Sequence, residues 1–202
     1  MNKFEKSLLE QYGEDDLKKI QAAKVGIAGA GGLGSNCAFN LVRSGFKDIR
    51  IIDFDIIDHS NLNRQFYFAD QVGKDKVEAL KENLLRITPD LDIDARVERI
   101  EKENIAGLFE DREIVVEAFD KAEYKSMLVE TFLVTNKLIV SASGLVGIGR
   151  SDEIKVNRLK KNLIVIGDMT SDSKDTPPVS PRVNIAAAKQ ADVVLEYVVG
   201  KS

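Results

Sequence analysis

The stretch Lys24-Val-Gly-Ile-Ala-Gly-Ala-Gly-Gly-Leu-Gly-Ser35 decides the fold class of this chain. It contains Gly29-x-Gly31-x-x-Gly34 between a short apolar strand, predicted at residues 24–29, and a helix predicted at residues 32–44. Glycines permit the tight turn and let the backbone approach a phosphate closely, and a helix N-terminus directs unsatisfied N–H groups toward an anion. We therefore expect Gly29, Gly31, Gly32 and Gly34 to hold the phosphates of a nucleotide.

An acidic strand end follows this turn. The second strand is predicted at residues 48–53, and its last residue, Asp53, lies 19 residues beyond Gly34. A carboxylate at that place can accept hydrogen bonds from ribose hydroxyls. Asp55 is a further candidate for nucleotide binding, and the alternative that Asp55 and Asp58 form a solvated acidic turn stays open.

Strands and helices alternate through most of the chain. Residues 5–22 indicate one or two helices with a break near Gly13. Further strands are predicted at residues 92–98, 113–118 and 138–141, and further helices at residues 74–87, 100–109 and 121–135. This alternation is typical of an α/β fold, here a Rossmann-like, doubly wound and mostly parallel sheet with helices on both faces.

The alternation of strands and helices ends after Gly144. Short strands at residues 146–150, 153–157 and 163–167 predict an antiparallel C-terminal extension of the sheet. Residues 168–181 are polar and rich in proline, which favours a long mobile loop, and residues 184–199 predict a closing helix. At 202 residues, the whole chain is expected to form a single domain, 1–202.

The composition limits the class of protein. A net charge of -4 gives no basic face for nucleic acid, and no apolar run is long enough for a membrane span. The polar start is not typical of a signal peptide, so a cytoplasmic location is expected. The single cysteine, Cys37, excludes an intramolecular disulfide and a zinc site of paired cysteines. Cys37 is expected to be a buried small hydrophobe, with a reactive thiol as the alternative.

A second polar cluster follows the acidic strand end, at residues 61–76. Asn61, Arg64 and Gln65 precede a helix expected to begin at residue 73, with Lys74 and Lys76 in its first turn. Cations at a helix N-terminus are disfavoured by the macrodipole, so two lysines there require a local anion. We expect Lys76 and Arg64 to neutralise phosphates, and Lys74 to lie on the solvated surface.

Asp120 comes directly after the strand predicted at residues 113–118. The carboxyl ends of parallel strands are where ligands bind in open α/β folds. A carboxylate beside a triphosphate is a natural Mg²⁺ ligand, since water and phosphate oxygens complete the coordination. A helix N-cap is the competing interpretation of Asp120.

Together these residues resemble the ThiF/MoeB/HesA class of activating enzymes, relatives of the ubiquitin-activating enzymes. The likeness runs from about residue 20 to the C-terminal helix, and residues 167–191 are most similar to the short ThiF forms. Five elements carry it in order: Gly29–Gly34, Asp53-Phe-Asp55, Asn61-x-x-Arg64-Gln65, Gly73-x-x-Lys76 and Asp120.

The resemblance implies roles for these residues. Asp53 would bind the ribose of ATP, Asn61, Arg64 and Lys76 the triphosphate, and Asp120 the Mg²⁺. The substrate would be a small ubiquitin-fold sulfur carrier protein of the ThiS type, adenylylated at its C-terminal Gly-Gly carboxylate. The resemblance also implies a homodimer.

The chain departs from that class in two places. Larger members supply an arginine from near the N-terminus, whereas residues 1–22 contain none, and Lys3 or Lys6 would be weak substitutes. Residues 168–181 contain no cysteine, so neither zinc nor a covalent step in that loop is expected. The single histidine, His59, is expected to be a turn residue, because the chemistry needs no general base.

Three other functions stay open. A NAD- or FAD-dependent oxidoreductase would share the glycine turn but would leave Asn61, Arg64 and Lys76 without a role. A non-catalytic partner that binds nucleotide or carrier is compatible with the missing arginine. An activating enzyme for another carrier, in molybdopterin or amino-acid biosynthesis, would have the same site.

Overall fold

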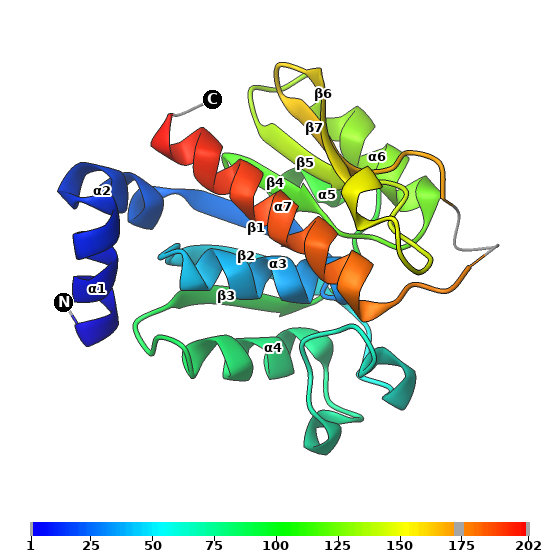
Figure 1. The fold of residues 1–202 in the computed structure, drawn as a ribbon, viewed down its shortest axis with the longest axis horizontal. Helices are drawn as coiled ribbons and strands as arrows, with labels where there is room; N and C mark the ends of the chain where they lie inside the picture. Colours follow the sequence, from blue (N-terminus) through cyan, green and yellow to red (C-terminus); the bar gives the residue numbers. More distant parts are fainter. Residues whose placement is uncertain (1, 172–175, 201–202) are drawn as a thin grey trace.

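The computed structural model describes residues 2–171 and 176–200, which form a three-layered α/β molecule (Figure 1). Its sheet has the strand order β3-β2-β1-β4-β5-β7-β6. All neighbouring pairs are parallel except the antiparallel pair β6–β7. The predicted fold class is confirmed. The strands are β1 Lys24–Ala28, β2 Asp48–Asp53, β3 Asp92–Val97, β4 Ile114–Glu117, β5 Leu138–Ala142, β6 Lys155–Lys160 and β7 Leu163–Gly167.

Helices cover both faces of this sheet. The helices are α1 Lys3–Tyr12, α2 Glu14–Ala22, α3 Gly32–Arg43, α4 Lys76–Leu85, α5 Ile105–Leu108, α6 Ala122–Phe132 and α7 Ser180–Val199, with short 3-10 turns η1 His59–Asn61, η2 Ala69–Gln71 and η3 Ser151–Glu153. Successive residues of a strand point to opposite faces of the sheet and pack in two separate cores. Ile51 packs with α3, α4 and α7, whereas Ile52 packs with α5 and α6. The α3 and α7 helices lie side by side on the first face (Figure 1).

The N-terminal segment forms two helices with the predicted break at Gly13, and α1 begins at Lys3, two residues before the predicted start. Asn2 caps α1, since its side-chain oxygen accepts the N–H of Glu5 while the Glu5 carboxylate accepts the N–H of Asn2. Gly13, at φ +80°, separates α1 from α2. Both helices lie beside the amino ends of the strands, at the end of the sheet where β1 begins (Figure 1).

Three helices are clearly shorter than predicted. The helix expected at residues 121–135 is α6, which runs only from Ala122 to Phe132. The helix expected at residues 74–87 begins at Lys76, because Gly73 has φ +88° and the N–H of Lys74 donates to the Gln71 carbonyl in a turn. The helix expected at residues 100–109 is reduced to α5, because the Asn104 side chain accepts the N–H of Glu101 and holds residues 101–104 in a turn.

The predicted strand at residues 146–150 is wrong. Gly144, Gly147 and Gly149 all have positive φ, so this segment is a loop. The strand expected at residues 153–157 is instead β6, which begins two residues later, and β7 pairs parallel with β5 on its other side. The closing helix α7 begins at Ser180 rather than at residue 184, because Pro181 is favourable at the start of a helix.

The loop predicted at residues 168–181 is described only in part. Residues 168–171 and 176–179 have no helix or strand, and residues 180–181 belong to α7. Residues 172–175 lie outside the described residues, so the mobility expected of the loop stays a prediction.

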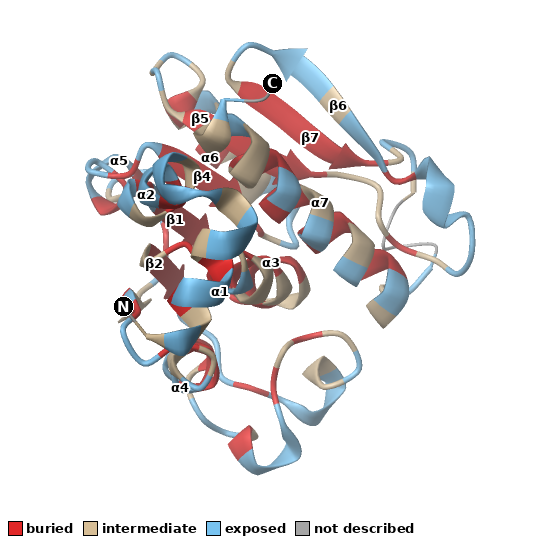
Figure 2. Cartoon of the chain, turned by 60° about the vertical axis from the view of Figure 1, so that its left-hand side comes forward, coloured by how far each residue is buried: buried red, intermediate tan, exposed pale blue. Residues whose placement is uncertain are grey.

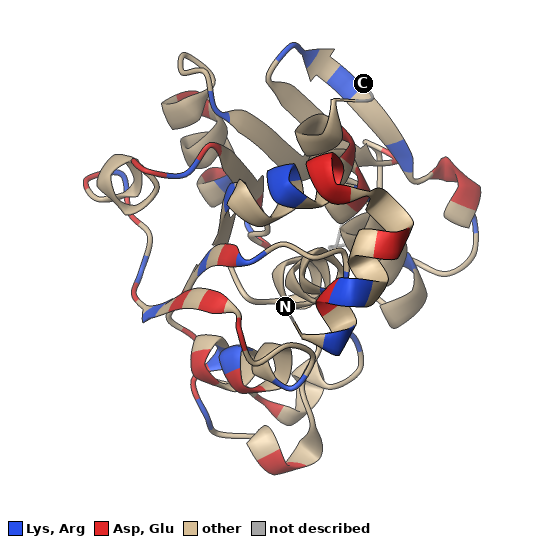
Figure 3. Ribbon diagram, turned by 90° about the vertical axis from the view of Figure 1, so that its left-hand side faces the viewer, with Lys and Arg blue, Asp and Glu red and all other residues tan. Residues whose placement is uncertain are grey.

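The outermost strand β6 is largely exposed, whereas its neighbour β7 is buried (Figure 2). Three of the six residues of β6 are basic, namely Lys155, Arg158 and Lys160 (Figure 3). Charged side chains on an edge strand discourage pairing with the edge of another chain. Elsewhere, Cys37 is fully buried, as predicted, and its burial raises the pKa of the thiol. Within the described part of the chain, every helix is too short or too polar to cross a membrane.

Candidate nucleotide site

A cleft of about 1110 Å³ opens at the carboxyl ends of the central strands. Its walls come from the glycine turn after β1, the acidic end of β2, the segments after β3, β4 and β5, and the start of α7. This is the edge of the sheet where open α/β folds bind ligands. Nine of the residues predicted for the site line the cleft: Gly29, Gly31, Gly32, Asp53, Asp55, Arg64, Gln65, Lys76 and Asp120.

The glycine turn requires glycine at two positions for steric reasons. Gly29 has φ +103°, and a Cβ there would lie 2.9 Å from the Ala118 carbonyl oxygen. A Cβ on Gly34 would lie 1.9 Å from the Gly29 carbonyl oxygen, so Gly34 lets α3 pack against the turn rather than facing the cleft. Gly31 is the N-cap of α3 and no side chain caps the helix, which leaves its first N–H groups for an anion.

The Asp53 carboxylate is held at the end of β2 by backbone N–H groups. One oxygen accepts the N–H of Ala30 at 2.6 Å and the other accepts the N–H of Asp55 at 2.8 Å. Burial raises the pKa of Asp53, and these two hydrogen bonds act against that rise. Tyr67 also supports the turn, because its hydroxyl donates to the Ala30 carbonyl at 2.7 Å. Nothing in the sequence around Tyr67 indicated this role.

Lys76 is buried in the cleft and has a carboxylate partner. Its side chain is 8% exposed, and its Nζ lies 2.7 Å from Oδ2 of Asp55, which is half exposed. The backbone N–H of Lys76 also donates to the Asp55 carbonyl. An anion was expected near this lysine, and the Asp55 carboxylate is one. A phosphate entering the cleft would compete with Asp55 for the ammonium group.

The segment before α4 places Arg64 and Gln65 in the cleft but not Asn61. Arg64 is half-buried, and its Nη1 donates to the Ser60 carbonyl and to Oδ1 of Asn63. Gln65 is buried, and among the described residues its Oε1 has no hydrogen-bond partner. A buried oxygen without a partner is unfavourable unless a ligand or water donates to it.

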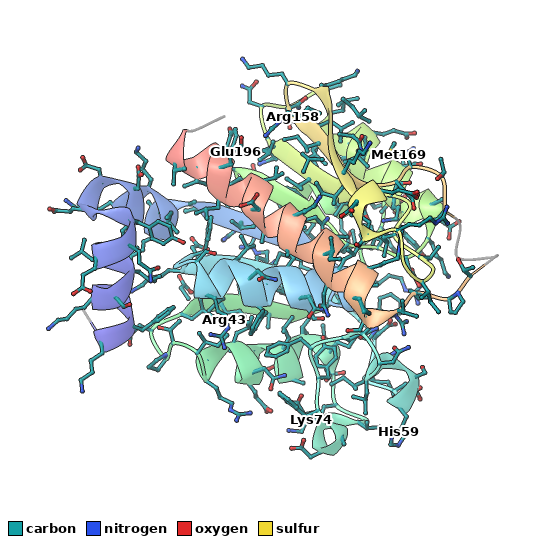
Figure 4. The ribbon with its side chains drawn as sticks, viewed as in Figure 1. Arg43, His59, Lys74, Arg158, Met169 and Glu196 are labelled. Carbon is teal, nitrogen blue, oxygen red and sulfur yellow. The ribbon has the colours of Figure 1, made fainter. Side chains whose placement is uncertain are left out.

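Asn61 lies in η1, where its side-chain oxygen accepts the N–H of Asp58. The side chain of Asp58 in turn accepts the N–H of Ser60, which closes a capping box around η1. His59 is exposed on the same turn and lies at the outer tip of this segment (Figure 4). The side chains of Asn61 and Asp58 therefore stabilise this turn, and the structure does not bring Asn61 to the cleft wall.

Asp120 is exposed on the cleft wall between β4 and α6. Within residues 2–171 and 176–200 its carboxylate has no hydrogen-bond or ion-pair partner. The alternative that Asp120 caps α6 is wrong, because the N-cap is Lys121 and no side chain caps the helix. The described residues also contain no group of three or more His, Cys, Asp or Glu suited to a metal. A single carboxylate fits a Mg²⁺ that takes its other ligands from phosphates and water.

A buried carboxylate lies three residues before Asp120 and was not predicted from the sequence. Glu117, at the end of β4, is fully buried, and both its oxygens lie 3.0 Å from the Nζ of Lys125. It also accepts the hydroxyl of Ser141 at 2.5 Å and the N–H of Phe119 at 2.7 Å. The available signal was an acidic residue inside an apolar strand, which requires a buried partner.

The chain matches the family described as ThiF family over residues 5–191. It belongs to the ThiF family. Curated relatives of this ThiF-family chain include the sulfur carrier protein ThiS adenylyltransferase of Bacillus subtilis, 38% identical over 119 residues, which cover 57% of this chain and 35% of that protein. The adenylyltransferase and sulfurtransferase UBA4 of Candida glabrata is 37% identical over 63% of this chain and 30% of its own length.

A third relative extends further along the chain. The tRNA threonylcarbamoyladenosine dehydratase 2 of Saccharomyces cerevisiae is 31% identical over 174 residues, which cover 84% of this chain and 37% of that protein. The ThiF-family chain spans well under half the length of each of these curated relatives.

Solved structures share the fold. The E. coli tRNA N6-threonylcarbamoyladenosine dehydratase TcdA in complex with AMP has a TM-score of 0.87 and 21% identity, over 97% of this chain and 94% of that chain. E. coli MccB with AMPCPP and MccA has a TM-score of 0.72 and 23% identity, over 100% of this chain and 64% of that chain. At these identities the likeness establishes the architecture of the ThiF-family chain alone.

Proposed function

We propose that this ThiF-family chain uses ATP to adenylylate a carboxylate, namely the C-terminal Gly-Gly carboxylate of a small ubiquitin-fold sulfur carrier of the ThiS type. The observation that carries the proposal is the convergence on one cleft of a glycine turn, the buried Lys76, Arg64, and Asp120, whose carboxylate has no partner among the described residues. A dehydrogenase would need the glycine turn and Asp53, but it would leave the later cations without a role.

In the proposed reaction, an oxygen of the carrier carboxylate attacks the α-phosphorus of ATP. A new P–O bond forms, the bond between the α-phosphorus and its bridging oxygen breaks, and pyrophosphate leaves with that oxygen. The carboxylate is already ionised at neutral pH, so no proton has to be removed. The obstacle is the approach of two anions and the charge that moves onto the leaving group.

The residues of the cleft would lower this barrier by positioning the two reactants and by neutralising their negative charge. The N–H groups at the start of α3 would bind phosphate oxygens, and Lys76 and Arg64 would stabilise the negative charge of the leaving pyrophosphate. Asp53 would orient the nucleotide through its ribose, and the Oε1 of Gln65, which has no partner in the part of the chain that the structure describes, would accept a hydrogen bond from the ligand. A Mg²⁺ held by Asp120 would supply further neutralisation of the phosphates.

The carrier is the finer part of the proposal. It is supported by the 38% identity with a protein named for acting on ThiS. A second candidate is action on a modified tRNA, which is supported by the relative aligned over 84% of this chain. Carriers of the molybdopterin and amino-acid pathways would use the same cleft chemistry. The homodimer and the cytoplasmic location also stay predictions, as does the single domain 1–202.

The N-terminal lysines do not replace the missing arginine within one chain. Lys3 and Lys6 are exposed on α1, and neither lines the cleft. Only the α1 of a second copy could bring either of them to a cleft. A light-scattering mass twice that of the chain is the expected result for the proposed homodimer.

A binding experiment separates the alternatives. Thermal unfolding with ATP and Mg²⁺ is expected to give a higher midpoint, whereas NAD⁺ or FAD is expected to leave it unchanged. Capture by immobilised chain, with ATP and Mg²⁺ present, should then retain a ThiS-type carrier from a panel that includes a molybdopterin-type carrier and total tRNA. Stabilisation by NAD⁺ or FAD but not by ATP would contradict the proposal. Retention of tRNA alone would favour the second candidate.

A further inference from the structure

A buried ion pair joins two segments that line one wall of the cleft. Nη2 of Arg182, in the first turn of α7, donates to Oδ2 of Asp168 at 2.6 Å, and the two side chains are 3% and 5% exposed. Asp168 follows β7 directly. The wall itself consists of residues 143–146 after β5, together with Ser171, Pro178 and Val183.

Arg182 fixes the loop after β5 as well. Its Nη1 donates to the carbonyls of Gly149 and Arg150, both at 2.8 Å, and its Nε to the carbonyl of Leu145 at 3.4 Å. A buried cation in the first turn of a helix opposes the macrodipole. Removing its carboxylate partner would leave an uncompensated charge, so these contacts act as one unit.

Asp168 holds the adjoining segment after β7. We call Arg182, Asp168 and the groups that their side chains bond the joint. Oδ1 of Asp168 accepts the N–H of Ser171 at 2.7 Å and the N–H of Thr170 at 2.9 Å. Burial would raise the pKa of Asp168, but these hydrogen bonds outweigh it and lower the pKa to about 2. A Cβ on Gly144, which has φ +73°, would lie 2.1 Å from the same oxygen. The loop after β5 can therefore pack against Asp168 only with glycine at this position.

The joint lies next to the phosphate turn but bonds to none of its groups. Val183, the residue after Arg182, packs on the turn so closely that a Cβ on Gly32 would lie 2.9 Å from its Cγ1. Among the described residues, the hydrogen-bond partners of the Arg182 and Asp168 side chains belong to segments 145–150 and 168–182. None of them is a residue predicted to bind ATP.

We infer that Arg182 and Asp168 are positioning residues for the acceptor carboxylate. They hold the wall of the cleft beside the phosphate turn, where the acceptor must lie to reach the α-phosphorus, while nucleotide binding depends on the turn, Asp53 and Lys76. The inference rests on the proposed function, since it assumes that an acceptor enters this cleft.

Variants of Arg182 and Asp168 test whether positioning of the acceptor is separate from binding of the nucleotide. Arg182→Ala and Asp168→Asn are expected to lower kcat/KM for a ThiS-type carrier about 100-fold, because a small misplacement of reacting groups costs that much, and to leave the Kd for ATP unchanged. Arg182→Lys keeps the charge but offers fewer donors, so it should recover part of the rate. Arg158→Ala is the matched control, because Arg158 pairs with Glu196 near the C-terminal end of α7 (Figure 4).

The outcomes separate the inference from the proposed function. Loss of ATP affinity in parallel with loss of carrier use would overturn the inference and leave the proposed function intact. If the wild-type chain binds ATP but activates no carrier, the proposed function fails. Hydrogen exchange then decides whether the joint holds the wall. Deuterium uptake in Asp168→Asn should rise in residues 144–150 and stay unchanged in residues 29–35, and a rise in both segments, or in neither, would contradict the inference.

Discussion

Lys76 and Lys74 lie two residues apart but have different surroundings. Lys76 is buried in the cleft beside Asp55, whereas Lys74 is half-exposed and pairs with Glu82 at the outer surface (Figure 4). We predict that Lys76→Ala lowers the rate of pyrophosphate exchange about 10²–10³-fold, the usual cost of losing one preorganised charge-stabilising group. Lys74→Ala is the matched control and should keep the wild-type rate. An equal loss in both variants would remove Lys76 from the site.

Asp120 is the residue on which the magnesium assignment depends. Asp120→Asn keeps the size of the side chain and removes its charge, so the exchange rate should fall sharply and the Mg²⁺ concentration for half-maximal rate should rise. The affinity for ATP measured without Mg²⁺ should not fall. Asp152→Asn, an exposed aspartate on η3 that lies outside the cleft, serves as the control. Wild-type exchange by Asp120→Ala would contradict the assignment.

At the scale of elements, the turn from β4 to α6 depends on the Glu117–Lys125 pair. Lys125→Met would leave the fully buried Glu117 without its cation, and breaking a buried pair this way costs roughly 3–5 kcal/mol of unfolding free energy. Glu117→Gln should cost less, because Lys125 is 22% exposed and can reach water. The variant that combines Lys125→Met with Glu117→Gln should recover most of the lost unfolding free energy, as measured by urea unfolding. Additive losses would show that the two side chains do not act as a pair.

The element boundaries show what the sequence can and cannot predict. Buried parallel strands read as apolar runs, so β1, β2, β4 and β5 were predictable within one or two residues. The run around Val146 and Ile148 alternates like a strand, yet glycines at positive φ make it a loop. Local periodicity does not report the φ that a glycine adopts.

The site was predictable where a motif fixes it locally. The glycine turn and Asp53 belong to one βαβ unit, so their spacing in the sequence predicts that they lie together. The Lys76–Asp55 and Arg182–Asp168 pairs join residues 21 and 14 positions apart across turns and a helix start. Such contacts depend on how the elements pack, and a single sequence does not determine this.

At the scale of the whole molecule, ion pairs between carboxylates and buried arginines make stability depend on acid pH. Asp111 hydrogen-bonds to Arg112 and Arg50, and these bonds lower its pKa below the ordinary value of 3.8. A lowered folded-state pKa contributes stability above pH 3.8 that is lost as the pH falls through the folded value. Asp53, whose pKa is raised, acts in the opposite sense. We predict a shallower acid decline of unfolding free energy for Asp111→Asn, measured by urea unfolding from neutral to acid pH, and an unchanged decline would contradict this.

In the proposed reaction, the adenylyl group of ATP is transferred to a carrier carboxylate in this cleft. Exchange of labelled pyrophosphate into ATP measures that reaction most directly. The wild-type chain should incorporate label only when a carrier ending in Gly-Gly and Mg²⁺ are both present, and Lys76→Ala should not. Binding of ATP without exchange for any carrier, or equal exchange by Lys76→Ala, would contradict the account.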